Sequence, residues 1–262
     1  MRKAARLRMS EGETVADRCR VLAETGFRGV DVPTPSDVDV AELRDATRAT
    51  GLAVANILAM RSLRWMLADD DPEVREHGRE GLEISLRDAA ATGASSVLLP
   101  SLLPEGVDPP AARANTAGEL RRVLPLAEEL RVRVAVENCW NGFVRTPEEV
   151  AAFVDGFESP WITVHFDVGN AQPLGSPVEW IAALGERIHK VDVKDFSSAL
   201  ALDGGVDAAQ AIELGEGDCD WPAVGAALRE IGYAGWVSAE VPGAGRGLLE
   251  RTSAVMDLVV VR

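Results

Sequence analysis

The sequence comprises 262 residues, of which 47% are hydrophobic and 26% are charged, and its formal net charge is −15. This composition can fill a hydrophobic core and argues against extended disorder, while the acidic balance argues against nucleic acids and anionic membrane surfaces as partners. Three cysteines without a CxxC spacing indicate neither a disulfide framework nor a thiolate metal site, and no apolar signal segment or 18-residue apolar run is present. We therefore expect a cytoplasmic protein that does not enter a membrane.

Short runs rich in Val, Ile and Leu alternate along the chain with longer segments of helical periodicity. This alternation is typical of parallel strands joined by helices. The runs that we interpret as strands are residues 5–9, 29–32, 52–58, 96–99, 133–138, 162–168, 188–195 and 236–241. Eight such units in roughly 250 residues predict a single-domain (β/α)₈ TIM barrel over residues 1–262. An open doubly wound sheet is disfavoured because no G-x-G-x-x-G turn follows the first strand.

Glycine and capping residues set the helix boundaries. Three predicted helices end before a glycine, namely 15–25, 40–50 and 222–231. The segment beginning at Thr146 reads as an N-cap followed by proline and two acids, which predicts a helix from Pro147. The longest irregular stretch, 196–220, follows the seventh strand, so we expect it to form a loop at the active-site face.

Four successive predicted strands each end with an acid: Glu137, Asp167, Asp192 and Glu240. The carboxyl ends of barrel strands form the mouth where such enzymes work. Crowded carboxylates repel one another unless a cation neutralises them, and oxygen ligands favour Mg²⁺ or Mn²⁺ over Zn²⁺. A strand-end acid can instead cap a helix or pair with a lysine, so the recurrence on four strands carries the prediction of one divalent metal ion.

Further polar and aromatic residues lie near these strand ends. His165 shares the inward face of Asp167 one layer deeper, as a hydrogen-bonded core residue or as a residue that orients a ligand. Trp140 follows Glu137 by three positions and either covers a substrate or packs within its loop. The glycine-rich segment 242–247 contains Arg246 and either binds a substrate anion or serves only the turn.

Several short motifs occur in an order typical of one known group of proteins. They are Glu-Thr-Gly-Phe-Arg-Gly-Val-Asp (24–31), Val-Glu-Asn (136–138), Phe-Asp-Val-Gly-Asn (166–170), Arg-Ile-His-Lys-Val-Asp-Val-Lys-Asp (187–195), Leu-Gly-Glu-Gly-Asp-Cys-Asp-Trp (214–221) and Gly-Tyr-Ala-Gly-Trp-Val-Ser-Ala-Glu (232–240). On these motifs the chain resembles the xylose isomerase-like TIM-barrel superfamily of sugar-phosphate isomerases and epimerases. The resemblance extends over nearly the whole chain.

The resemblance implies one divalent metal held by Glu, Asp, His and Glu, with the two glutamates also passing the proton. These positions correspond to Glu137, Asp167, Asp192 and Glu240, so aspartate replaces the usual histidine at the third position. A histidine that commonly follows the second ligand by three residues is Asn170 here. Asp192 is then either a direct ligand or the partner of Lys190 or Lys194, which share its strand face.

From these features we expect an isomerase or 3-epimerase acting on a small sugar, keto-sugar or sugar phosphate. Glu137 and Glu240 would transfer the proton through a metal-bound enediolate, and Trp140, Asn170, Lys194 and Arg246 would contact substrate. The alternatives are an inosose dehydratase-like lyase at the same site, or an inactive carbohydrate-binding barrel, which the substitution at Asp192 favours. A nuclease is disfavoured because the sequence has only three histidines, too few for a multi-zinc site, and a net charge of −15. A homo-oligomer is compatible with the sequence, which leaves the oligomeric state open.

Overall fold

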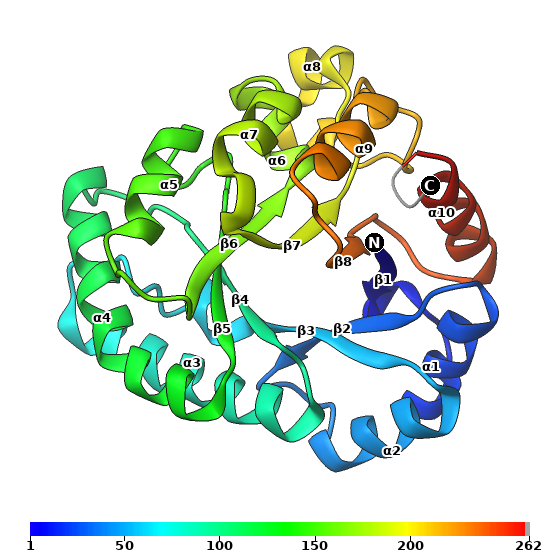
Figure 1. Ribbon diagram of the computed structural model, residues 1–262, viewed down its shortest axis with the longest axis horizontal. Coiled ribbons are helices and arrows are strands. Elements are labelled where there is room, and N and C mark those ends of the chain that lie inside the picture. Colours follow the sequence, from blue (N-terminus) through cyan, green and yellow to red (C-terminus); the bar gives the residue numbers. More distant parts are fainter. Residues whose placement is uncertain (260–262) are drawn as a thin grey trace.

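The computed structural model describes residues 1–259 of the chain. Within this range, eight parallel strands pair in sequence order, and the last strand pairs with the first to close a barrel. The helices surround the strands on the outside (Figure 1). The predicted (β/α)₈ barrel is therefore confirmed.

The strand and helix bounds are as follows. The strands are β1 (Arg2–Arg6), β2 (Gly29–Thr34), β3 (Ala53–Ala59), β4 (Ser96–Pro100), β5 (Arg133–Glu137), β6 (Ile162–Asp167), β7 (Ile188–Val193) and β8 (Trp236–Ala239). The α-helices are α1 (Val15–Glu24), α2 (Val40–Thr50), α3 (Pro72–Thr92), α4 (Pro109–Leu130), α5 (Pro147–Asp155), α6 (Val168–Ala171), α7 (Pro177–Leu184), α8 (Ser198–Ala209), α9 (Trp221–Glu230) and α10 (Arg246–Val259). No helix among the described residues is long and apolar enough to cross a membrane.

Side-chain caps fix the helix starts that the sequence indicated. The Thr146 hydroxyl accepts a hydrogen bond from the backbone N–H of Glu149, which confirms the predicted start of α5. At α1, Thr14 and Asp17 form a reciprocal capping box. Helix α2 ends at Gly51, whose φ of 73° places it in the left-handed region that glycine adopts at low cost.

Two predicted segments differ from the structure. The first strand is Arg2–Arg6, and residues Leu7–Met9 form a short 3₁₀ helix instead, so the prediction of 5–9 was displaced toward the more apolar residues. The predicted irregular stretch 196–220 contains helix α8, which was missed because Gly205 interrupts its periodicity with φ 72° and ψ −170°.

Alternation along the strands separates two kinds of buried residue. In β7, Val191 and Val193 join the hydrophobic core, whereas Lys190 and Asp192 are buried polar residues. The register between β6 and β7 places Asp167 opposite Asp192. Polar side chains from neighbouring strands therefore meet inside the barrel near its carboxyl end.

Candidate active site at the barrel mouth

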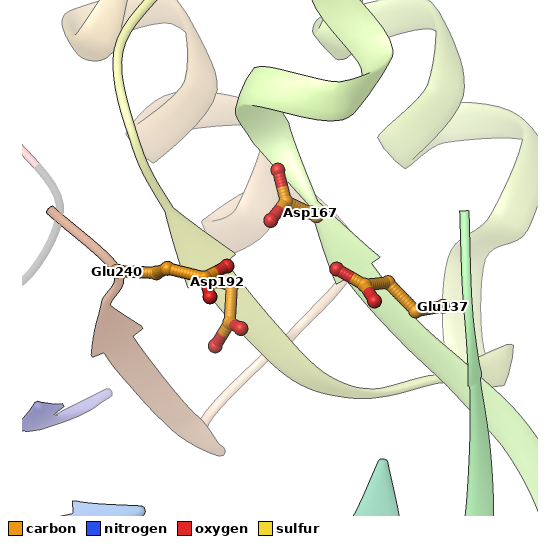
Figure 2. Close-up of side chains that lie close together, drawn as sticks. All are labelled: Glu137, Asp167, Asp192 and Glu240. Carbon is orange, nitrogen blue, oxygen red and sulfur yellow. The ribbon is translucent and has the colours of Figure 1, made fainter. Parts of the chain in front are cut away.

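The four predicted acids converge at the carboxyl end of the barrel. One carboxylate oxygen from each of Glu137, Asp167, Asp192 and Glu240 lies within 4.8 Å of the others. Figure 2 shows the side chains pointing toward one another from four different segments. The first three residues are buried, and the Glu240 side chain retains 25% exposure. The prediction that these four acids share one site agrees with this geometry.

Below the mouth, four charged side chains form a closed arrangement that we call the ion ring, consisting of Arg6, Asp31, Lys190 and Asp192. Asp31 Oδ2 accepts hydrogen bonds from Arg6 Nη1 at 3.2 Å and from Lys190 Nζ at 2.8 Å. Asp192 Oδ1 accepts from Lys190 Nζ at 3.2 Å, and Asp192 Oδ2 accepts from Arg6 Nη2. Two cations and two anions alternate, so the ion ring is electrically neutral.

Both carboxylate oxygens of Asp192 thus have nitrogen partners within the ion ring. His165 Nε2 also lies 2.9 Å from Asp192 Oδ2, which places this buried imidazole against Asp192. Burial raises the pKa of Asp192, but Arg6, His165 and Lys190 outweigh it and hold the pKa well below its usual value. Of the two arrangements left open by the sequence, this geometry matches pairing of Asp192 with Lys190.

The remaining groups form what we call the mouth cluster, consisting of Glu137, Asp167, Lys194 and Glu240. Lys194 Nζ lies 3.0 Å from Asp167 Oδ2 and 3.3 Å from Glu240 Oε2. Asp167 Oδ1 accepts a hydrogen bond from the backbone N–H of Asn170 at 2.8 Å, so this aspartate also caps α6. Its Oδ2 accepts no hydrogen bond of good geometry and faces the cluster.

Glu137 is fixed by the segment that follows β6. Asn170 Nδ2 donates a hydrogen bond to Glu137 Oε1 at 3.2 Å, and Cys139 Sγ lies 3.7 Å from Glu137 Oε2. Asn170 Oδ1 in turn accepts from Gln210 Nε2 at 3.2 Å. Asn170 therefore orients the Glu137 carboxylate and links it to the end of α8.

The mouth cluster carries more negative than positive charge. Burial, with Asp167 as the next cause, raises the pKa of Glu137 to about 8. Burial likewise raises the pKa of Asp167 to about 6, despite Lys194. Burial also raises the pKa of Glu240, but Arg6 and Lys194 outweigh it and bring that pKa to about 2.

Three carboxylates face one ammonium in the mouth cluster, and Arg6 Nη2 of the ion ring lies 3.5 Å from Glu240 Oε2. Because Arg6 is balanced within the ion ring, the two groups together carry an excess of two negative charges when all are ionised. The Arg8 guanidinium, 3.9 Å from Glu240 Oε1, is half exposed and screened by water. A divalent cation would balance the excess, and an all-oxygen donor set suits Mg²⁺ or Mn²⁺. The residues present therefore fit a divalent ion.

Two predicted substrate contacts lie outside this cluster. Trp140 is half-buried and lines a cleft of about 680 Å³ together with Leu103 and Arg145. Arg246 begins α10 and forms an ion pair with Glu24 at the end of α1. Neither Trp140 nor Arg246 contacts the four acids through a described hydrogen bond or ion pair.

Sequence reasoning missed Arg6 and Asp31, which complete the ion ring. Arg6 is the last residue of β1 and Asp31 lies within β2, and the two are opposite each other in the register of these strands. The sequence signal is a charged residue inside an apolar strand run, because a buried Arg or Asp needs a partner of opposite charge, although the sequence does not say which partner.

Comparison with known proteins gives one family match and several relatives. The family described as "Xylose isomerase-like TIM barrel" matches residues 19–257. The chain is 26% identical over 189 residues to "Putative L-ribulose-5-phosphate 3-epimerase SgbU" of Escherichia coli (strain K12), covering 71% of this chain and 65% of that protein. It is 27% identical over 129 residues to protein MJ1311 of Methanocaldococcus jannaschii, covering 48% of this chain and 42% of that protein.

Solved structures share the same fold. A D-tagatose 3-epimerase-like protein superposes with a TM-score of 0.85 at 20% identity, covering 99% of this chain and 97% of that chain. An L-ribulose 3-epimerase superposes with a TM-score of 0.82 at 19% identity, covering 99% of this chain and 94% of that chain. At these identities the likeness establishes the barrel fold.

Proposed function

The chain belongs to the xylose isomerase-like TIM-barrel family, and from this premise we propose that it is a metal-dependent isomerase or 3-epimerase of a small keto-sugar or sugar phosphate. The names of its relatives support this proposal, because they include a D-tagatose 3-epimerase-like protein, an L-ribulose 3-epimerase and a putative L-ribulose-5-phosphate 3-epimerase. Fold alone does not determine a reaction, so the proposal depends on the mouth cluster.

The observation that carries the proposal is the placement of two glutamates on opposite sides of one site. Glu137 ends β5 and Glu240 follows β8, and Figure 2 shows their carboxylates approaching each other from opposite sides, with Asp167 between them. A base on one face of a substrate carbon and an acid on the other face is what inversion of a C–H centre requires.

Glu137, Asp167 and Glu240 would hold the divalent ion, which would polarise the substrate carbonyl as a Lewis acid and so acidify the adjacent C–H. Asp192 occupies the fourth family position. Because its oxygens already accept hydrogen bonds from Arg6 and Lys190, the geometry supports a role in which it anchors Arg6 and does not contact the ion.

The protein groups then account for the proton movements. One glutamate takes the proton from the carbon next to the carbonyl, and the other returns a proton from the opposite face of the planar enediolate. Return to the same carbon gives the epimer, whereas return to the carbonyl carbon gives the aldose or ketose isomer. Asn170, which donates a hydrogen bond to Glu137 Oε1, fixes the carboxylate that faces the substrate.

Incubation with a panel of ketoses, ketose phosphates and inososes in D₂O tests this proposal. Proton transfer predicts deuterium at one carbon next to the carbonyl, with the hydroxyls retained. Loss of a hydroxyl would indicate the dehydratase instead. Absence of exchange on every sugar, together with no uptake of Mn²⁺ or Mg²⁺, would contradict the proposal and support a carbohydrate-binding barrel.

A further inference from the structure

The Lys194 ammonium contacts two of the carboxylates that could hold a metal ion. Its Nζ contacts the carboxylates of Asp167 and Glu240 at 3.0 and 3.3 Å, and both residues belong to the group that could hold an ion. A divalent ion bound by these carboxylates would share them with the ammonium. Two cations that share the same carboxylates repel each other strongly in a buried site.

Packing holds the stem of Lys194 close to the cluster. A methyl group at Gly169 would lie 2.5 Å from Lys194 Cγ, so the absence of a side chain at Gly169 makes room for the lysine. The fold therefore fixes the aliphatic stem of Lys194, and only the terminal ammonium can change its position. That end remains accessible, since the Lys194 side chain keeps 13% exposure beside the partly exposed Glu240.

Lys190, a second buried lysine of the barrel interior, offers a contrast. Lys190 Nζ donates hydrogen bonds to Asp31, Asp192 and Ser238 at 2.8, 3.2 and 2.6 Å. Its side chain is only 1% exposed and both of its carboxylate partners are fully buried. Lys190 therefore cannot leave its place without breaking the ion ring, whereas Lys194 can move toward the mouth by giving up two contacts.

We propose that Lys194 is an exchangeable counter-ion of the mouth cluster. In the metal-free protein its ammonium neutralises Asp167 and Glu240. When a divalent ion binds these carboxylates, it would displace the ammonium toward the mouth. This inference rests on the proposed metal-dependent function, and it makes Lys194 and the metal competitors for the same two carboxylates.

Titration of the metal-stripped protein with Mn²⁺ by isothermal calorimetry tests the exchange. Lys194→Met removes the competing charge and should bind Mn²⁺ at least about tenfold more tightly than the parent. Arg8→Ala is the matched control, because it removes one positive charge 3.9 Å from Glu240 without a hydrogen bond to the cluster. We expect its affinity to remain within about threefold of the parent.

Thermal unfolding gives a second readout on the same proteins. Without metal, Lys194→Met should melt at a lower temperature than the parent, and saturating Mn²⁺ should raise its melting temperature by more than it raises that of the parent. Lys194→Gln, which keeps a polar end without a charge, serves if the methionine variant does not fold.

The outcomes separate this inference from the proposed function. If the parent binds Mn²⁺ and both Lys194 variants bind it equally or more weakly, the exchange is wrong and the metal-dependent function stands. If only the Lys194 variants bind Mn²⁺, the competition is supported and the metal dependence of the parent fails. If no protein binds Mn²⁺, the exchange is overturned, and the D₂O experiment on the parent still decides whether it transfers protons.

Discussion

The ion ring and the mouth cluster use the same residue types on neighbouring strands, yet they differ in charge balance and access to solvent. In the ion ring, two carboxylates meet two cations and are fully buried. In the mouth cluster, three carboxylates share one ammonium, Arg6 of the ion ring lies 3.5 Å from Glu240, and Glu240 reaches the surface. A strand-end acid whose charge is already matched stabilises the barrel, whereas one left without a match is available for a metal or a substrate.

The largest expected effect comes from removing a carboxylate of the mouth cluster. Glu240→Gln keeps the shape of the side chain but cannot exchange a proton with the substrate, so turnover should fall by at least about 10³-fold. Because Glu240 is partly exposed, the melting temperature should change little. Glu250→Gln, at an exposed position on α10, is the control. Activity within a factor of about ten of the parent would remove Glu240 from the mechanism.

For Asp192→Asn we expect the opposite result, a large loss of stability with little change in metal binding, because Asp192 belongs to the ion ring. Loss of this charge leaves Arg6 and Lys190 with one carboxylate inside the ion ring and only the longer 3.5 Å contact of Arg6 with Glu240, which should lower the free energy of unfolding by about 3–5 kcal/mol. If Asp192 does not contact the ion, Mn²⁺ affinity should stay within about threefold of the parent. Urea unfolding and calorimetric titration of the same preparation measure the two quantities.

A second substitution at this position sharpens the distinction. If Asp192 is a direct ligand, Asp192→His should restore the commoner family donor set and shift metal preference toward Co²⁺ or Zn²⁺. If Asp192 serves only the ion ring, replacing it with histidine removes the negative charge that holds Arg6 and Lys190. Metal preference should then not change. Competition titrations with Mn²⁺ and Co²⁺ decide between these accounts.

A histidine beside the ion ring should make the stability sensitive to acid. Burial, followed by the charges of Arg133, His165 and Lys190, lowers the pKa of the neighbouring His189 to about 4. Between about pH 6.5 and about pH 4, His189 is therefore protonated in the unfolded chain but not in the folded chain. The free energy of unfolding falls as the pH is lowered through this range. The loss from this residue should reach about 3 kcal/mol.

Urea unfolding at pH 7 and at pH 4.5, for the parent and for His189→Gln, measures this contribution. The difference between the two proteins isolates His189 from the carboxylates that also titrate. His189 Nε2 lies 3.1 Å from Ser95 Oγ, a contact that glutamine can replace. An equal loss of stability in both proteins on acidification would show that His189 is not the source.

The sequence predicted the barrel and the convergence of the four acids, because both follow from local patterns, whereas the role of these acids as metal ligands stays a prediction. Four successive apolar strand runs each end with an acidic residue. Glu137 and Glu240 could therefore be placed at the mouth from the alternation of apolar residues alone. The partners of Asp192 could not be predicted in the same way. Arg6 and Asp31 lie more than 150 residues from Lys190 and Asp192 in sequence, and only closure of β1 against β8 brings them together.

Arg246→Ala should have the smallest effect on stability and activity. This variant tests whether Arg246, a predicted substrate contact, is part of the substrate site at the mouth. The Arg246 guanidinium pairs with Glu24, and both side chains are about half exposed, so the pair contributes little to stability. We expect the melting temperature to change by less than about 2 °C.

The glycine-rich segment also places Gly245 near the Glu11 carboxylate, which would repel a substrate phosphate. The ratio of activity on phosphorylated and free sugars should therefore be the same in Arg246→Ala and the parent. A selective loss of activity on the phosphorylated sugar would instead show that Arg246 leaves Glu24 to bind the anion, and would extend the substrate site from the mouth cluster to the start of α10.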